Sequence, residues 1–313
     1  MIDPKLEDLY ARRTLHAAFE RVRANAGCRG ADGVTVGRFA ERLEEELDHL
    51  EDRLRSRRYH PYPLLSFPIP KPRHGIRHLA VPTVRDRVAQ TAAYLVTKDR
   101  FDAELEQCSY AFRPGRSVKS AIRRVDELRR EGYRFIVDAD VEDFFGQVTH
   151  DRLLGRLRRM RLDPCLVALF ESWIGAEVYD GQRVYRLDRG IAQGSVVSPM
   201  LANLFLDDLD ENLAIFGKTV VRYADNLLIL CKTAAEAGEA LELTDYLLAE
   251  LELRLNREKT ATGSFEQGFK FLGAVFLKDA IYLPFEPERP EPSNPVLPPP
   301  LDLLAYLELR EKD

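Results

Sequence analysis

A stretch of twelve residues, TVVRYADNLLIL at 219–230, constrains the fold of this chain more than any other feature. Apolar and β-branched residues stand on both sides of a short polar segment, Tyr223-Ala224-Asp225-Asn226. This pattern favours two paired strands joined by a tight turn. Asp and Asn are common turn residues, so an ordinary hairpin would also explain the segment. The rest of the sequence decides whether the carboxylate has a further use.

A second acidic strand end supplies a partner for the first. YRFIVDADVEDFF at 133–145 begins as an apolar strand and runs into Asp138 and Asp140, which share one face because alternate strand residues point the same way. Carboxylates that extend a buried strand are costly unless something compensates them. Two such ends converging would suit Mg²⁺, which takes carboxylates, waters and substrate phosphates. Two such ions roughly 4 Å apart clamp the attacking and leaving oxygens of nucleotidyl transfer.

Charge is distributed unevenly along the chain. The 313 residues carry a net charge of −5, but residues 53–130 carry +11 and the remainder −16. A basic block inside an acidic chain favours a local polyanion-binding surface, and the alternative is a solvated helical face with acidic neighbours.

Composition excludes some classes of protein. No run of eighteen apolar residues is present, so we expect no transmembrane helix and no membrane partner. The N-terminus has no apolar signal region, which indicates the cytoplasm. The four cysteines are scattered and form no CxxC pair, so we expect free, reduced thiols.

Helical and strand patterns alternate irregularly, which predicts an α+β fold. Helices are expected at 6–27, 36–58 with Thr35 as N-cap, 84–107, 118–130, 150–173, 200–213 and 234–254. Strands are expected around a turn at 73–75, in a hairpin followed by a loop at 181–199, and in hairpins at 219–230 and 269–285. Residues 286–300 hold seven prolines and indicate a linker or a tail draped over the surface, followed by a short helix. We predict three segments: 1–130, 131–285 and 286–313.

Seven segments, in order, resemble reverse transcriptases of the bacterial group II intron type. They are GADGVTV, IPKPRHGIRHLAVPTVRDRVAQ, SYAFRPGRSVKSAI, DADVEDFFGQVTHDRLL, GIAQGSVVSPMLANLFLDDLD, VRYADNLLIL, and the pair LNREKT and FKFLGAVF. The resemblance runs from about Leu15 to Phe276. It implies a right-hand polymerase with N-terminal extension and fingers in 1–130 and palm in 131–285.

The resemblance also implies roles for individual residues around the metal. Asp140 and Asp225 would bind Mg²⁺, which Mn²⁺ can replace, together with Asn226 and the Val141 carbonyl. Phe145 would exclude a ribose 2′-hydroxyl, although a core aromatic is the alternative.

Further roles concern the substrates. Lys71 and Arg77 would grip the triphosphate, with surface salt bridges as the alternative. Gln193 and Gly194 would pack beside the nucleotide and template. The remaining residues would contact nucleic acid: Arg113 and Arg116 the template backbone, and Phe271, Leu272 and Gly273 the primer end, where ordinary strand core is the alternative.

Three departures from the family pattern qualify this reading. Asn226 stands where the family's Tyr-Ala-Asp-Asp box has its second Asp, so one negative charge is missing from the predicted metal site. FFGQVTH stands where the family usually has an Asp-Asn-Ile-Asp run. Only the proline-rich stretch and one short helix follow Phe276, so we expect the thumb to be absent or vestigial.

The segment FLKDAIYLPF and the proline-rich tail resemble reverse transcriptases encoded with type III CRISPR adaptation genes. We therefore expect an RNA-directed DNA polymerase that copies RNA into DNA for spacer acquisition. Its partners would be an RNA template, a DNA primer, deoxynucleoside triphosphates and a CRISPR integrase complex. Two alternatives stay open: a catalytically degenerate scaffold that binds nucleic acid, and a truncated group II intron maturase.

Overall fold

The computed structural model describes residues 4–70, 75–283 and 295–310. These residues form two compact units, each built from separate parts of the chain. Unit 1 comprises residues 1–101, 150–198 and 294–313, and unit 2 comprises residues 102–149 and 199–293. The contiguous segments that we predicted differ from this division, because residues 150–198 return to pair with the first segment.

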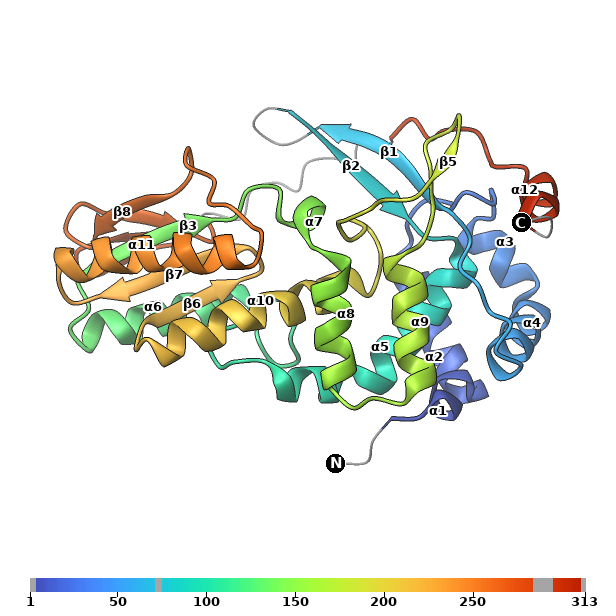
Figure 1. Cartoon of the computed structure of the whole chain (residues 1–313), viewed down its shortest axis with the longest axis horizontal. Helices are drawn as coiled ribbons and strands as arrows, with labels where there is room; N and C mark the ends of the chain where they lie inside the picture. Colours follow the sequence, from blue (N-terminus) through green and yellow to red (C-terminus); the bar gives the residue numbers. More distant parts are fainter. Residues whose placement is uncertain (1–3, 71–74, 284–294, 311–313) are drawn as a thin grey trace. The chain divides into compact units, whose positions relative to one another are not determined.

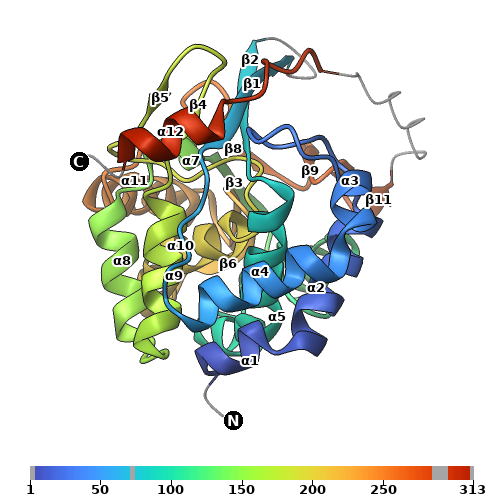
Figure 2. The ribbon, with the colours of Figure 1, turned by 90° about the vertical axis from the view of Figure 1, so that its right-hand side faces the viewer.

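Unit 1 is mainly helical (Figure 1). Its helices are α1 (Leu6–Tyr10), α2 (Arg12–Ala24), α3 (Val36–Glu41), α4 (Leu43–Arg55), α5 (Val84–Glu104, whose last turn crosses into unit 2), α8 (His150–Arg159), α9 (Pro164–Ile174) and α12 (Leu303–Arg310). Helices α1, α2 and α4 pack side by side (Figure 2). The predicted N-cap of α3 is confirmed, since the Thr35 hydroxyl accepts a hydrogen bond from Arg38 N at 3.2 Å.

A four-stranded sheet completes unit 1. Its strands are β1 (Leu64–Pro70), β2 (Ile76–Val81), β4 (Val178–Tyr179) and β5 (Val184–Tyr185), in the order β2-β1-β4-β5. The pair β1–β2 is antiparallel, as predicted, and β4 adds to β1 in parallel with Leu64 opposite Val178. The predicted turn at 73–75 lies largely outside the described residues.

The C-terminal segment from Pro295 to Asp302 lies on this sheet. Leu297 and Leu301 pack against a buried cluster that includes Leu65, Phe67 and Tyr179. Leu301 N also donates to Ala31 O at 2.8 Å. The prediction of a draped tail is therefore confirmed for the part of it that the structure describes.

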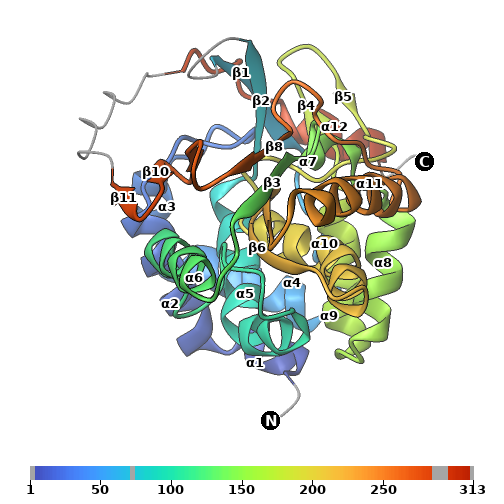
Figure 3. The ribbon, with the colours of Figure 1, turned by 90° about the vertical axis from the view of Figure 1, so that its left-hand side faces the viewer.

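Unit 2 holds an antiparallel sheet with helices on both faces (Figure 3). Its strands are β3 (Phe135–Asp140), β6 (Thr219–Tyr223), β7 (Asn226–Cys231) and β8 (Ala261–Ser264), in the order β6-β7-β3-β8. Its helices are α6 (Val118–Arg130), α7 (Phe144–Gln147), α10 (Ser198–Ile215) and α11 (Ala234–Glu250). A small second sheet contains β9 (Phe269–Phe271), β10 (Ala274–Leu277) and β11 (Ala280–Tyr282).

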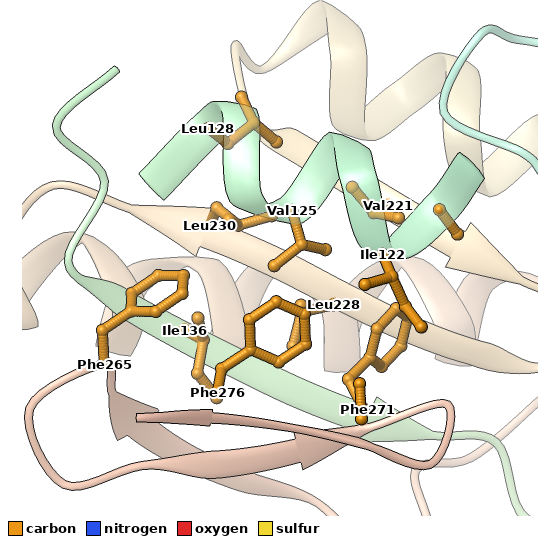
Figure 4. Packing of buried hydrophobic residues seen from close by; sticks show 12 residues of the cluster. Ile122, Val125, Leu128, Ile136, Val221, Leu228, Leu230, Phe265, Phe271 and Phe276 are labelled. Carbon is orange, nitrogen blue, oxygen red and sulfur yellow. The ribbon is translucent and has the colours of Figure 1, made fainter. Parts of the chain in front are cut away.

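The core of unit 2 holds the four-stranded sheet between its neighbours. On one face, Ile136, Leu228 and Leu230 pack against α6 and against Phe271 and Phe276 of the small sheet (Figure 4). Helix α11 packs on β3 and β7. These apolar layers hold the β3–β7 pair in one register, because a shift by one residue would turn every buried side chain to the opposite face.

Among the described residues, no helix has both the length and the apolar character needed to cross a lipid bilayer.

Candidate active site

The two acidic strand ends meet at one end of the four-stranded sheet. In the antiparallel pair β3–β7, Asp140 lies directly opposite Asn226. In the hairpin β6–β7, Tyr223 pairs with Asn226, so Ala224 and Asp225 form a two-residue turn. The structure thus brings together Asp140, Asp225 and Asn226, three of the predicted metal-site residues, and the packed core of unit 2 fixes their approach.

This cluster carries more negative charge than its partly buried setting favours. Burial raises the pKa of the Asp225 carboxyl, and the negative charge of Asp140 raises it further. Burial, followed by the charge of Asp140, likewise raises the pKa of Asp138 to about 6. Carboxylates with raised pKa values favour binding either a proton or a cation. This end of the sheet therefore favours the binding of a positively charged group.

Lys259 supplies part of that charge. Its Nζ donates to Asp140 Oδ1 at 2.9 Å, and its side chain is 64% exposed while that of Asp140 is 15% exposed. The same charge lowers the pKa of Asp225. The segment LNREKT, which contains Lys259, was singled out in the sequence, but no residue in it was predicted to belong to the site. An ammonium group on the carboxylate shows that the site accepts a cation.

The backbone around Asp140 is tied to the same segment. Asn256 N donates to Asp140 O at 2.8 Å and Glu142 N donates to Arg254 O at 2.8 Å, so Val141 bridges Leu255 in an antiparallel pair. These two hydrogen bonds do not use the Val141 carbonyl. Its role as a metal ligand stays a prediction.

The donor set fits a hard divalent cation. Asp140, Asp225 and Asn226 offer carboxylate and amide oxygens, which Mg²⁺ prefers to nitrogen or sulfur. The Asn226 amide currently turns its Nδ2 toward Asp225 Oδ1, at 3.4 Å. Within residues 4–70, 75–283 and 295–310, no group of three or more His, Cys, Asp or Glu could hold a metal. With one amide in place of a carboxylate, the candidate site relies on two acids.

Phe145 lies on α7, just after the β3 strand end. The neighbouring Phe144 is buried and packs against Phe205, with ring centroids 6.2 Å apart, whereas Phe145 is only half-buried and contacts Phe144 edge-on at 5.4 Å. Phe144 therefore serves as the core aromatic. The half-buried position of Phe145 is compatible with the predicted contact to a sugar, which stays a prediction.

Three of the predicted nucleotide-binding residues, Arg77, Gln193 and Gly194, belong to unit 1. Arg77 is exposed on β2, opposite Ile69, and Lys71 lies outside the described residues. Gln193 O accepts a hydrogen bond from Ala80 N at 2.7 Å. Gly194 has φ +122° and its α-carbon lies so near β2 that a Cβ would come within 3.1 Å of Ala80 O. Glycine is required at this position for both reasons.

Gln90, from α5, holds the loop that follows Gly194. Its Oε1 accepts from Ser195 Oγ and from Val196 N, both at 3.0 Å, and Gln90 is buried. The sequence showed Gln90 at the end of a quoted motif, but its function as a loop anchor depends on a contact across more than a hundred residues.

The two arginines predicted to hold template differ in placement. Arg113 is buried and donates to Asp102 Oδ1 and to the carbonyls of Asp102, Glu106 and Ser109. Arg116 is more accessible, lies over the ring of Tyr110 and donates to Ser109 O at 2.8 Å. Arg116 also donates to Gln107 O at 2.6 Å, so both arginines have intramolecular partners. Because Arg113 is buried and Arg116 is only half-buried, template contact is more compatible with Arg116.

The predicted primer-end residues form a strand and its turn. Phe271 is 3% exposed and belongs to the core of unit 2, which favours the strand-core alternative for this residue. Leu272 and Gly273 have φ +50° and +86° and link β9 to β10. Contact of this turn with nucleic acid stays a prediction.

Comparisons with known proteins identify the family. A model described as "Reverse transcriptase (RNA-dependent DNA polymerase)" matches residues 69–276. Protein YkfC of Escherichia coli (strain K12) is 31% identical over 283 residues, covering 78% of this chain and 74% of YkfC. The group II intron-encoded protein LtrA of Lactococcus lactis subsp. cremoris is 26% identical over 201 residues, covering 63% of this chain and 33% of LtrA.

The telomerase structures support the fold. Telomerase from Candida albicans, in complex with a fragment of telomeric RNA, has a TM-score of 0.60 at 13% identity and covers 83% of this chain and 51% of that chain. A partial Cas6-RT-Cas1–Cas2 complex is 26% identical, with a TM-score of 0.49, and covers 79% of this chain and 42% of that chain. The predicted α+β polymerase fold is confirmed. Since the family model spans about two thirds of the sequence, this chain belongs to the reverse transcriptase family.

Proposed function

We propose that this chain is an RNA-directed DNA polymerase that extends a DNA primer on an RNA template with deoxynucleoside triphosphates. One observation carries the proposal: the strand register sets Asp140 opposite Asn226, with Asp225 in the adjoining turn. Three oxygen-bearing side chains at the end of a rigid sheet are what a divalent-metal nucleotidyl transferase requires.

Each of these side chains has a distinct part in the proposal. Asp140, Asp225 and Asn226 would hold Mg²⁺, with Mn²⁺ as a substitute. When bound, the metal would favour the primer hydroxyl as a nucleophile and stabilise charge on the phosphates. The Asp140 carboxylate would then exchange its ion pair with Lys259 for the metal. Phe145 would exclude ribonucleotides by contact.

Primer extension on poly(rA)/oligo(dT) tests this proposal. Asp140→Asn and Asp225→Asn should each lower the rate by about a hundredfold or more, since each removes charge from the metal site. Asp245→Asn is the matched control, because this carboxylate lies on α11 of the same unit, is 40% exposed and pairs with the exposed Arg257 at 2.6 Å. Thermal unfolding of all three variants must stay cooperative. Full activity of either site variant would refute the assignment.

Asn226 favours a second candidate, a non-catalytic palm that binds nucleic acid as a scaffold. The amide lacks the charge of the family's second Asp. This candidate predicts primer–template binding without extension, in Mg²⁺ or Mn²⁺, with or without a partner. Any extension that depends on both Asp140 and Asp225 excludes it.

We further propose that the polymerase acts with a CRISPR integrase in spacer acquisition. The support is the resemblance of residues 276–300 to reverse transcriptases of that group. Co-purification with integrase subunits encoded beside the gene would support it, whereas an intron flanking the gene would favour the maturase alternative.

A further inference from the structure

The hairpin that carries Asp225 has a strained tip. Ala224 takes φ +58°, the left-handed region, which costs a residue with a Cβ roughly 1–2 kcal/mol. Glycine or asparagine would take this conformation more readily. Something in the fold must therefore hold Ala224 in place.

Arg222, two residues earlier, makes the contact that holds it. Its Nη1 donates to Ala224 O at 3.0 Å. The carbonyl of Ala224 and the amide nitrogen of Asp225 belong to one planar peptide unit. A hydrogen bond that orients this carbonyl consequently orients the backbone from which the Asp225 carboxylate projects.

The Arg222 guanidinium is itself held by side chains of α10. Arg222 is fully buried and alternates with the residues that face α6, so it points to the opposite face of the sheet, toward α10. Its Nε lies 2.9 Å from both carboxylate oxygens of the buried Asp210. Nη1 also donates to Asn203 Oδ1 at 2.9 Å. Both partners come from α10, so the helix sets the position of the arginine.

The main chain of Arg222 is anchored as well. Its N–H donates to Cys108 O at 2.8 Å, and its carbonyl accepts from Tyr110 N at 2.9 Å. Asn203 Nδ2 donates to Ala111 O at 2.7 Å, which ties the same helix to the same segment. Arg222 therefore links the β6–β7 hairpin to α10 and to the segment around Cys108 and Tyr110.

We propose that Arg222 is a positioning residue that holds the Ala224–Asp225 peptide in its metal-binding orientation, with Asp210 and Asn203 of α10 as its anchor. This inference rests on the proposed function, because it concerns the same metal site. The positive charge of Arg222 also lowers the pKa of Asp225. A purely structural ion pair would stabilise unit 2 without affecting metal binding.

Arg222→Lys is the informative variant. Lysine keeps the positive charge beside Asp210 but cannot orient several donors as the planar guanidinium does. We expect a rate of primer extension about tenfold lower, with the Kd for primer–template and the KM for deoxynucleotide unchanged within about twofold. The Mg²⁺ concentration for half-maximal rate should rise.

Arg129→Lys is the matched control. Arg129 is also a buried arginine of unit 2, and its Nη2 donates to Asp126 Oδ1 at 2.9 Å on α6. Both substitutions should lower the melting temperature. Only Arg222→Lys should change the rate, and an equal loss in Arg129→Lys would show that the rate merely follows the stability of unit 2.

Binding of Mn²⁺, measured by electron paramagnetic resonance of the free ion, separates this inference from the proposed polymerase activity. We expect Arg222→Lys to weaken the Mn²⁺ affinity that depends on Asp225 by about threefold or more, whether or not the chain extends primers. If Arg222→Lys does not fold, Asp210→Asn decides, since it keeps the volume of the anchor but weakens its hold on the guanidinium. Unchanged Mn²⁺ affinity in a folded variant would overturn the inference.

Discussion

Replacing Asn226 with Asp should have opposite effects on the metal-free protein and on its activity. The Asn226 amide now donates from Nδ2 to Asp225 Oδ1 at 3.4 Å. In Asn226→Asp this donor becomes a second carboxylate beside Asp225, and Asp140 lies directly across the strand pair. Three negative charges would then converge at a place where burial and the charge of Asp140 already raise the pKa of Asp225.

Coulomb's law gives the scale of the effect. Two unit charges 4 Å apart interact by about 4 kcal/mol at an effective dielectric constant near 20. Partial exposure and salt screening reduce this interaction energy to roughly a tenth to a third of its value, or about 0.4–1.4 kcal/mol. Without metal that energy is repulsive, and Asn226→Asp should lower the melting temperature at pH 8. With divalent cations it becomes attractive, and the rate at low Mg²⁺ should rise by about two- to tenfold.

The assay is primer extension across a Mg²⁺ titration, repeated with Mn²⁺. Mn²⁺ binds such ligands more tightly, so it should raise the rate of the natural protein more than that of the variant. Asn212→Asp is the control for net charge, because that amide donates to Asp208 O within α10. If the Asp variant is no faster at any Mg²⁺ concentration and its metal-free stability is unchanged, Asn226 lies outside the metal shell and the reasoning fails.

Three further substitutions test other parts of the structure. Phe145→Val should increase incorporation of ribonucleotides relative to deoxyribonucleotides, and equal discrimination would make Phe145 a core residue like Phe144. Arg116→Gln should weaken primer–template binding and reduce the slope of log K against log salt by about one. Arg113→Gln should mainly lower the melting temperature, because Arg113 is buried. The reverse result would contradict the roles given to the two arginines. Burial raises the pKa of Asp32 to about 6, so the folded state disfavours the charged carboxylate. The neutral carboxyl therefore contributes its full share of the stability below about pH 4, and this contribution is lost as the pH rises through 6. Asp32→Asn, which can still accept from Val34 N, should therefore stabilise the protein by up to about 3 kcal/mol at pH 7–8 and have little effect near pH 4; an equal effect at both pH values would show that the carboxyl does not titrate as described.

Local pattern determined most of the elements and the acidic strand ends. The helices at 84–104, 118–130 and 234–250, the hairpin 219–231 and the strand 135–140 follow from hydrophobic period and turn residues, which act between near neighbours in sequence. The face shared by Asp138 and Asp140 follows from the strand period in the same way. The absence of a negative charge at Asn226 is evident from the sequence alone.

The surroundings of those carboxylates were decided by tertiary structure. Lys259 reaches Asp140 across 119 residues of sequence, and a lysine in a polar segment has no local feature that indicates such a partner. No local pattern in the sequence indicates that Arg113 and Arg222 are buried. Both are buried in the structure, because partners brought near by the fold compensate their desolvation. The sequence alone therefore identified the candidate metal-binding carboxylates. Only the packing of the chain determined which groups hold and neutralise them, since burial and ion pairing depend on residues far apart in the sequence.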